Sequence, residues 1–335
     1  MVGHGEFDLI AGLFAPLAAS NPGALGLTDD AALLDISADC QAVTTVDAMV
    51  EGVHFLGADA ADLVGQKLLR VNLSDLAAMG AKPLCYLLTL VRPQSTSEEW
   101  LQRFARGLAN DQRTFGIALA GGDTVSTPGP LVLSLTAIGV VQKNQAIRRS
   151  GAQPGDDLWV SGTIGDAALG LALVQGSEKS ALADLSQAER NFLVARLQRP
   201  EPRLALGQGL IGLATAAVDI SDGLIADVGH LADASKVNLE LDLSALPLSG
   251  AARHAVGERD EEILNLMTGG EDYELAFTAP AAEAKRIKLL ADKLKLSVSK
   301  AGKVTEAGNS LGGAVLVTGT DGEVLPVKST GWTHF

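Results

Sequence analysis

Residues 71–83 read VNLSDLAAMGAKP, a helical pattern in which apolar side chains surround one carboxylate. Val71, Asp75 and Met79 are spaced four residues apart, so a helix places them on one face. Gly80 is a suitable helix stop. A bare carboxylate on a buried face is costly, which favours Asp75 as a metal ligand. A charge at the helix edge that reaches solvent, and a buried ion pair, are the alternatives.

On either side of this stretch, apolar runs rich in valine, isoleucine and threonine alternate with helical patterns. Strands are predicted at 42–46, 84–91, 117–120, 131–141, 158–161, 216–220, 239–243, 273–278 and 314–318. Helices are predicted at 61–79, 98–115, 164–174, 187–198, 203–213, 224–234 and 282–294. Thr163 and Ser186 are predicted N-caps, and Gly116 is a predicted helix stop. The alternation predicts an α/β or α+β fold.

The chain has 335 residues, a length that favours about two domains. The segment 144–157, NQAIRRSGAQPGDD, is polar and rich in turn formers, and it follows a long predicted strand. We therefore predict a domain boundary there, with one domain over residues 1–145 and a second over residues 146–335.

The formal charge is −14, from 26 basic and 40 acidic residues. This balance argues against nucleic-acid partners, which need a basic surface. The longest apolar segment, near 84–91, is far shorter than the ~20 residues that span a bilayer, and the N-terminus lacks a signal-peptide pattern. We therefore expect a cytoplasmic protein with no membrane partner. Cys40 and Cys85 have no partner at metal-ligand spacing and are predicted to be buried thiols.

Six short stretches place Asp or Glu at predicted strand ends or beside glycine. They are TDD at 28–30, TTVD at 44–47, NLSD at 72–75, GGD at 121–123, DISDG at 219–223 and GGED at 269–272. Mg²⁺ prefers hard oxygen ligands, usually one or two carboxylates with waters and substrate phosphates. A bound cation is the usual way for an acidic protein to handle phosphates, because the metal reverses the local charge. Each stretch alone could be a simple turn, but six together indicate carboxylates that converge on a few ions.

The DISDG stretch connects an apolar strand to a helix predicted to start near Leu224. Ser221 or Asp222 could cap that helix. A helix N-terminus also binds phosphate readily, and Gly223 would let a ligand approach the backbone. The GGDT stretch at 121–124 has the same character at another strand end. The GxxxxGK[ST] pattern and the protein-kinase signatures are absent from the sequence.

Two further residues allow both a structural and a functional interpretation. His54 is a lone histidine in VEGVHF at 50–55, and a lone histidine is usually structural. Trp332 lies in a polar tail, where it could pack on its own domain or stack on a flat ligand.

These stretches, in this order and spacing, resemble the thiamine-monophosphate kinase family. That family belongs to the superfamily of aminoimidazole ribonucleotide synthetase and selenophosphate synthetase. The resemblance runs from GEF at 5–7 to Trp332, and residues 71–83 are its most specific block. The other blocks are VEGVHF at 50–55, GGDT at 121–124, RSGAQPGD at 149–156, DISDGL at 219–224 and GGEDYEL at 269–275.

The resemblance implies two α/β halves, with an N-terminal sheet that pairs with its twin across a homodimer. The predicted strand 131–141 would otherwise offer a long exposed edge. The implied activity is ATP-dependent phosphorylation of thiamine monophosphate to thiamine diphosphate. ATP and several Mg²⁺ ions would lie mainly on the N-terminal half, and the C-terminal half would complete the substrate site.

The resemblance also implies roles for individual residues. The matches to metal-binding positions are Asp30, Thr45, Val46, Asp47, Asp75, Asp123, Asp219 and Asp222, with Asp30, Asp75 and Asp219 expected to be the most critical. The matches to ATP contacts are Gly121, Gly122, Asp123, Arg149 and Ser221, and the matches to acceptor contacts are His54, Glu271 and Trp332. No single side chain is assigned as the catalyst.

Two positions depart from the family pattern. Thr28 stands where the family usually has glycine, and a positive φ there would carry a steric cost. Val46 stands where serine or threonine is usual, so that only its backbone carbonyl could reach a metal.

The mechanism implied is direct attack by an ionised phosphate oxygen of the acceptor on the γ-phosphorus of ATP. Another ATP-using member of the superfamily, such as a selenophosphate synthetase or a purine-pathway ligase, is the first alternative. Selenophosphate synthetases generally carry a reactive cysteine or selenocysteine in a glycine-rich stretch, and Cys40 is not in one. A catalytically silent nucleotide-binding protein is the second alternative.

Overall fold

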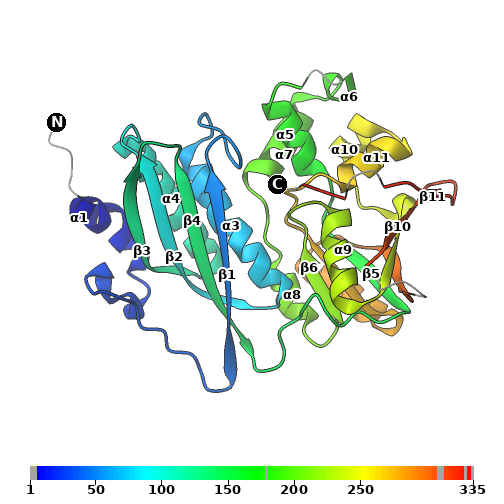
Figure 1. The fold of residues 1–335 in the computed structure, drawn as a ribbon, viewed down its shortest axis with the longest axis horizontal. Coiled ribbons are helices and arrows are strands. Elements are labelled where there is room, and N and C mark those ends of the chain that lie inside the picture. Colours follow the sequence, from blue (N-terminus) through cyan, green and yellow to red (C-terminus); the bar gives the residue numbers. More distant parts are fainter. Residues whose placement is uncertain (1–5, 178–179, 308–312, 328–329, 333–335) are drawn as a thin grey trace. The chain divides into compact units, whose positions relative to one another are not determined.

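The structure is a computed structural model that describes residues 6–177, 180–307, 313–327 and 330–332 (Figure 1). The chain divides into two compact units. Unit 1 comprises residues 1–76 and 81–144, and unit 2 comprises residues 77–80 and 145–335. Within the described ranges, no helix is long and apolar enough to cross a membrane.

Unit 1 is a four-stranded sheet with helices on one face (Figure 1). Its strands are β1 (Cys40–Val50), β2 (Lys82–Pro93), β3 (Ala118–Thr127) and β4 (Val132–Gln142), in the order β1-β4-β2-β3. Its helices and helical turns are α1 (Glu6–Leu9), η1 (Ile10–Phe14), α2 (Ala15–Ala18), η2 (Pro22–Leu27), α3 (Ala61–Ala78) and α4 (Glu98–Phe115). Alternate residues of β4 are buried, including Leu133, Leu135 and Ala137, as expected of a strand with one covered face.

The bounds of α4 match the prediction because both of its ends carry clear signals. The side chain of Ser97 accepts a hydrogen bond from the backbone N–H of Trp100, which caps the first turn. Gly116 ends the helix in the left-handed conformation, at φ +67°.

Unit 2 contains a mixed sheet flanked by helices. Its strands are β5 (Asp156–Ser161), β6 (Ala216–Asp219), β7 (Asn238–Asp242), β8 (Leu275–Pro280), β9 (Val298–Thr305), β10 (Val315–Thr318) and β11 (Val324–Leu325). Among the described residues their order is β11-β10-β7-β9-β5-β8-β6. The helices and helical turns are α5 (Asp166–Val174), α6 (Ser180–Ala183), α7 (Gln187–Gln198), α8 (Leu204–Leu210), α9 (Leu224–Ser235), η3 (Leu243–Ala245), α10 (Gly250–Val256), α11 (Asp260–Met267), η4 (Ala281–Glu283) and α12 (Ala284–Leu294). Helix α9 packs against β6, β7 and β10, and α5 packs against α7.

Several local predictions are wrong for identifiable reasons. Strand β4 is central and hydrogen-bonds to both β1 and β2, so it offers no free edge. Thr163 does not cap α5, because the helix begins after Gly165 and the Thr163 hydroxyl instead bonds the carboxylate of Asp166. Ser186 does form the predicted cap, as part of a capping box. Cys85 is buried as predicted, whereas Cys40 is only half-buried.

Two ion pairs join α3 to α4 in very different surroundings. The Arg70 guanidinium binds the carboxylate of Asp111 with an Nε–Oδ2 distance of 2.6 Å, and the two side chains are only 7% and 1% exposed. Arg103 binds Asp62 at 2.8 Å, with side chains that are 41% and 33% exposed. Gln66 also donates to Asp111 at 2.7 Å, which satisfies the buried carboxylate further.

A second buried polar group lies in unit 2, in the segment that immediately precedes β8. The carboxylate of Glu274 accepts hydrogen bonds from Arg196, Arg203 and the hydroxyl of Ser161. The neighbouring Asp272 carboxyl accepts from the backbone N–H of Gly165 at 2.8 Å. Burial raises the pKa of Asp272 to about 8, although its backbone hydrogen bonds act in the opposite direction.

The two α3–α4 ion pairs provide a matched test of burial. Asp111→Ala is expected to lower the free energy of unfolding by about 3–5 kcal/mol, because it leaves Arg70 buried without this carboxylate. Asp62→Ala is expected to lower it by less than about 1 kcal/mol, because solvent screens the exposed pair. Chemical denaturation of both variants measures the difference. Equal losses of unfolding free energy in the two variants would contradict the expected effect of burial.

The raised pKa of Asp272 predicts how stability depends on pH. Between about pH 4 and pH 8 the folded chain keeps a proton that the unfolded chain releases. This contribution to stability is therefore complete below about pH 4 and is lost as the pH rises through 8. Relative to Asp272→Asn, the wild type should lose about 1.4 kcal/mol of unfolding free energy for each pH unit in that window. Denaturation curves at pH 5, 6.5 and 8.5 test this, and parallel pH profiles would contradict it.

Candidate functional site

Two hydrogen bonds between strand β1 and helix α3 involve three of the predicted metal-binding residues of unit 1. The Thr45 hydroxyl donates to the Asp75 carboxylate, with an Oγ1–Oδ2 distance of 2.5 Å. The backbone N–H of Asp47 donates to the side-chain oxygen of Asn72 at 3.1 Å. Asn72 is fully buried and donates its own amide to the carbonyl of Leu68, one turn earlier in α3. This group consists of hard oxygen atoms, which is the donor set that Mg²⁺ prefers.

Val46 lies between Thr45 and Asp47 on β1, and successive side chains of a strand point to opposite faces. Its side chain is 61% exposed. Its apolar side chain can make no contribution to a metal site, and its carbonyl remains the predicted donor.

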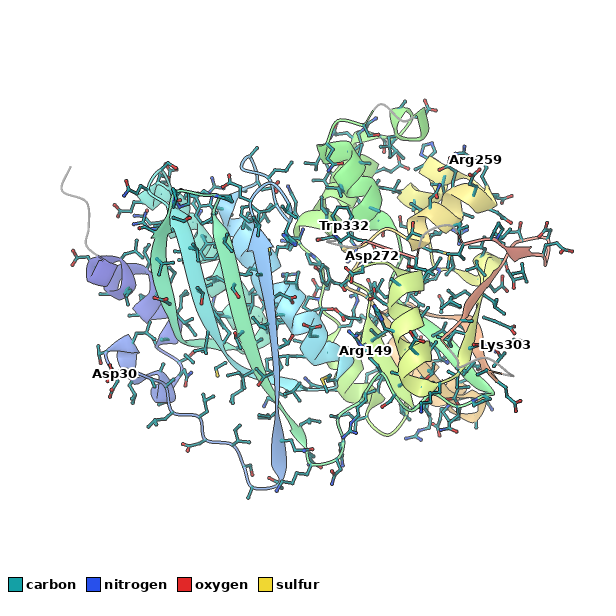
Figure 2. All side chains as sticks on the ribbon, in the orientation of Figure 1. Asp30, Arg149, Arg259, Asp272, Lys303 and Trp332 are labelled. Carbon is teal, nitrogen blue, oxygen red and sulfur yellow. The ribbon has the colours of Figure 1, made fainter. Side chains whose placement is uncertain are left out.

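A pocket of about 460 Å³ in unit 1 is lined by four further predicted residues of this half. Its lining includes Asp30 from the segment that follows η2, and Gly121, Gly122 and Asp123 from β3. Apolar residues of the N-terminal segment, β2 and β4 complete the wall. Figure 2 shows Asp30 on the N-terminal segment of the unit.

The two glycines of the pocket lie inside β3, not at the end of a strand as predicted. A Cβ atom on Gly122 would lie 2.0 Å from the carbonyl oxygen of Leu88 on the neighbouring strand β2. Glycine at position 122 therefore lets β2 and β3 approach closely, and any side chain there would force this wall of the pocket apart.

Thr28 carries no backbone strain, because its φ is −113°. The positive φ values of this turn fall instead on Leu25, Gly26 and Leu27. The Thr28 hydroxyl donates to the carbonyl of Leu25 at 2.8 Å, which holds the turn that precedes Asp30.

His54 is held in one tautomer by the backbone. Its Nδ1 accepts a hydrogen bond from the backbone N–H of Val50 at 3.1 Å, so the neutral ring carries its proton on Nε2. The buried ammonium of Lys67 donates to the His54 carbonyl at 3.0 Å and fixes the turn. In this arrangement Nε2 is a hydrogen-bond donor and cannot accept a proton from a substrate hydroxyl.

In unit 2, Asp227 organises the loop between β6 and α9. Its Oδ2 atom accepts hydrogen bonds from the backbone N–H groups of Ser221, Asp222 and Gly223, at 3.0, 3.0 and 3.2 Å. The N-cap of α9 is Gly223, so the alternative in which Ser221 or Asp222 caps the helix does not hold. The three N–H groups bind a carboxylate of the chain itself. Burial raises the pKa of Asp227 to about 7, against the opposing effect of these bonds.

The predicted acceptor residues of unit 2 are joined to the same loop through the backbone. The N–H of Glu271 donates to the Ser221 carbonyl at 2.7 Å, and the N–H of Trp332 donates to the Asp222 carbonyl at 3.0 Å. Glu271 has a φ of +75°, an unusual value for a residue other than glycine and one often found at functional sites. The Trp332 side chain is 60% exposed (Figure 2).

The remaining predicted residues of unit 2 are Asp219 and Arg149. Asp219 ends β6 and is buried. Arg149 has an exposed side chain, and its carbonyl accepts a hydrogen bond from the Ser235 hydroxyl at the end of α9. No hydrogen bond described for unit 2 joins the Arg149 side chain to Ser221, so their shared role at ATP stays a prediction.

The six predicted carboxylates are divided between the units. Asp30, Asp47, Asp75 and Asp123 belong to unit 1, and Asp219 and Asp222 belong to unit 2. Within the part of the chain that the structure describes, no three His, Cys, Asp or Glu side chains are grouped to hold a metal ion. Their convergence on shared ions therefore stays a prediction.

Sequence reasoning missed Asn72 and Asp227 as site residues. Asp227 lies on α9 between the buried residues Leu224 and Leu231, so it is a carboxylate on an apolar helical face. The same signal singled out Asp75, and it would have found Asp227 as well.

Comparison with known proteins places both parts of the chain in one family of folds. The N-terminal domain of AIR synthase related proteins matches residues 28–141, and the C-terminal domain matches residues 153–312. A thiamine-monophosphate kinase from Caulobacter vibrioides is 43% identical over 332 residues, which cover 98% of this chain and 90% of the relative.

Two solved structures support the same relationship. The thiamine-monophosphate kinase of Stenotrophomonas maltophilia is 42% identical with a TM-score of 0.83, covering 95% of this chain and 97% of the other. The structure described as AaThiL complexed with AMPPCP and TMP is 30% identical with a TM-score of 0.76, covering 99% and 97%. The two-domain fold and the near full-length similarity together show that this chain belongs to the thiamine-monophosphate kinase family, within the AIR synthase related proteins.

Proposed function

We propose that this protein transfers the γ-phosphate of ATP to thiamine monophosphate, giving thiamine diphosphate and ADP. The observation that carries the proposal is the similarity, over 99% of the chain, to a structure described as complexed with AMPPCP and TMP. AMPPCP is an analogue of ATP, and TMP names the acceptor in that relative. The pocket lined by Asp30 and the Gly121-Gly122-Asp123 stretch supports a nucleotide site in unit 1.

The first half of the chain, residues 1–145, is proposed to bind ATP with Mg²⁺, and residues 146–335 to complete the substrate site. Thr45, Asp47 and Asp75 would hold metal together with Asp30, Asp123 and the Val46 carbonyl, and Asp219 and Asp222 would do so from unit 2. Mg²⁺ needs only one or two carboxylates when substrate phosphates and water supply its other ligands. The oxygen donors of these residues fit that requirement. Bound Mg²⁺ would supply positive charge to the phosphates.

The reaction proposed is an in-line displacement. A phosphate oxygen of thiamine monophosphate forms a bond to the γ-phosphorus while the bond from that phosphorus to the bridging β–γ oxygen breaks, and ADP leaves. The acceptor oxygen is already ionised, so no base is required. Gly121, Gly122, Arg149 and Ser221 would position ATP, and Glu271 and Trp332 would position the acceptor.

The tautomer of His54 supports a phosphate acceptor over an alcohol. Free thiamine would need a base to remove its hydroxyl proton, whereas Nε2 of His54 already carries a proton. A donor at this position suits a ligand with acceptor atoms, and phosphate oxygens are such atoms. We therefore propose that His54 donates a hydrogen bond to the acceptor.

Product analysis with matched acceptors tests this function. Incubation with ATP and Mg²⁺ should convert thiamine monophosphate to the diphosphate, and free thiamine should give no phosphorylated product by mass spectrometry. Asp75→Asn keeps the size of the side chain but loses its charge, and it is expected to reduce the rate by about 10²–10³-fold. Trp332→Ala should raise the KM for the acceptor and leave the KM for ATP unchanged. Comparable turnover of free thiamine would overturn the acceptor assignment.

A homodimer through the face of the unit 1 sheet that carries Val46 and Val125 is also proposed, and a cytoplasmic location stays a prediction. Val46, Thr136 and Leu87 are register partners across β1, β4 and β2, so they share the face opposite the buried residues of β4. Val46 is 61% exposed, Leu87 38% and Val125 of β3 41%, which is unusual for large apolar side chains grouped on one sheet.

The mass in solution tests the dimer. The wild type is expected to have twice the mass of the 34.5 kDa chain at micromolar concentration. Val125→Glu should shift it towards monomer, because the substitution places a charge on the proposed interface. Leu289→Glu is the control, since Leu289 is a 68% exposed residue of α12 in unit 2 and should leave the mass unchanged. A monomeric wild type would contradict the proposal.

A further inference from the structure

The loop of residues 219–223 uses both sides of its backbone for hydrogen bonds. On one side, three successive N–H groups bind the carboxylate of Asp227. On the other side, the carbonyls of Ser221 and Asp222 accept from the N–H groups of Glu271 and Trp332. The proposed metal and nucleotide residues of unit 2 and its proposed acceptor residues are therefore parts of one hydrogen-bonded structure.

The carboxylate of Asp227 occupies a position that commonly binds a phosphate ligand. Successive backbone N–H groups at the start of a helix attract anions, and a ligand phosphate usually takes them. Here the Asp227 side chain is 2% exposed and all three contacts go to a single oxygen, Oδ2. The loop therefore has these N–H groups satisfied before any ligand binds, and it contributes to the site through Asp219, Ser221 and Asp222.

Two glycines allow the segments that carry Glu271 and Trp332 to approach the carbonyl groups of the loop. A Cβ atom on Gly270 would lie 2.4 Å from the Ser221 carbonyl oxygen, and one on Gly331 would lie 2.6 Å from the Asp222 carbonyl oxygen. Each glycine immediately precedes a residue whose N–H binds the loop, namely Glu271 and Trp332. A side chain at either position would push that residue away from the loop.

We propose that Asp227 is a positioning residue of the phosphoryl transfer, which fixes the 219–223 loop and through it sets both the metal–nucleotide side chains and the acceptor-binding residues. This inference rests on the proposed function. Asp227 touches no substrate and acts through the backbone of Ser221, Asp222 and Gly223. Its loss should therefore affect turnover and acceptor binding together, which loss of a single ligand contact would not do.

The test compares Asp227→Ala, Asp227→Asn and the control Asp233→Asn. Asp227→Ala should lower kcat and raise the KM for thiamine monophosphate, each by about 10–100-fold, as is typical when the support of a metal ligand is removed. Asp227→Asn keeps an acceptor oxygen and should recover part of both losses. Asp233 is exposed on the same helix, and its substitution should change neither constant. A folded Asp227→Asn or Asp227→Ala with wild-type kcat and KM would overturn the proposal.

Hydrogen exchange separates this inference from the proposed function. The amides of residues 221–223 should exchange slowly in the wild type and rapidly in Asp227→Ala, whether or not the protein turns over thiamine monophosphate. Unchanged exchange would overturn the role of Asp227, whereas a wild type without turnover would overturn only the function.

Gly331→Ala tests the carbonyl side of the loop if Asp227→Ala fails to fold. It should raise the KM for the acceptor, because Trp332 is displaced, while the KM for ATP stays within about twofold of the wild type. An unchanged acceptor KM would contradict the link between Trp332 and the loop.

Discussion

A carboxylate withdrawn from water must be given hydrogen-bond donors, and this requirement shapes both units of the protein. In unit 1, Asp111 receives a guanidinium and an amide, and Asp75 receives the hydroxyl of Thr45. In unit 2, Asp227 takes three backbone N–H groups, and Glu274 takes two arginines. The donors differ from one carboxylate to the next. Guanidinium groups bind Asp111 and Glu274, a hydroxyl binds Asp75, and backbone N–H groups bind Asp227.

The candidate site also depends on places where two backbones come unusually close. Gly122 lets β3 lie against β2 at the pocket wall, and Gly270 lets the segment before β8 lie against Ser221. Beyond Gly270 the chain passes through two residues with positive φ, Glu271 at +75° and Tyr273 at +50°. Such conformations persist only where the surroundings determine them. The buried Asp272 carboxyl between them binds the N–H of Gly165 and supplies that constraint.

Much of the fold could be predicted because the residues that indicate each helix or strand lie within that element or next to it. The bounds of α4 follow from Ser97 and Gly116, and β6 and β8 of unit 2 are short, mostly apolar runs. Strand β9 was not predicted, since only Ala301 and Val304 of its residues are buried and its lysines reach acidic residues on neighbouring strands. The central place of β4 was missed for a related reason. Contacts between segments far apart in the sequence decide which strands pair. The residue pattern within one segment does not predict those contacts.

Some residues of the candidate site could be predicted from the sequence, and others could not. Asp75 was recognised as an acidic residue in an apolar helix, and its contact with Thr45 lies where the resemblance implied a shared ligand set. The role of Asp227 was hidden, because a turn that looks open to phosphate in the sequence is already filled in three dimensions. The difference between an empty anion site and an occupied one depends on a side-chain conformation, which composition and spacing do not determine.

The hydrogen bond between Trp332 and Asp222 has a consequence for how the protein is made. It joins residues that are far apart in the chain, and the bond between Glu271 and Ser221 spans a shorter but still long separation. Contacts of this kind form late in folding, because a long loop must be closed before they are gained. During synthesis, the 219–223 loop and its Asp227 anchor can be in place well before Trp332 leaves the ribosome. The contact of Trp332 with the loop is therefore the last part of this hydrogen-bonded structure to be completed, and a nascent chain can acquire the core of unit 2 before that contact forms.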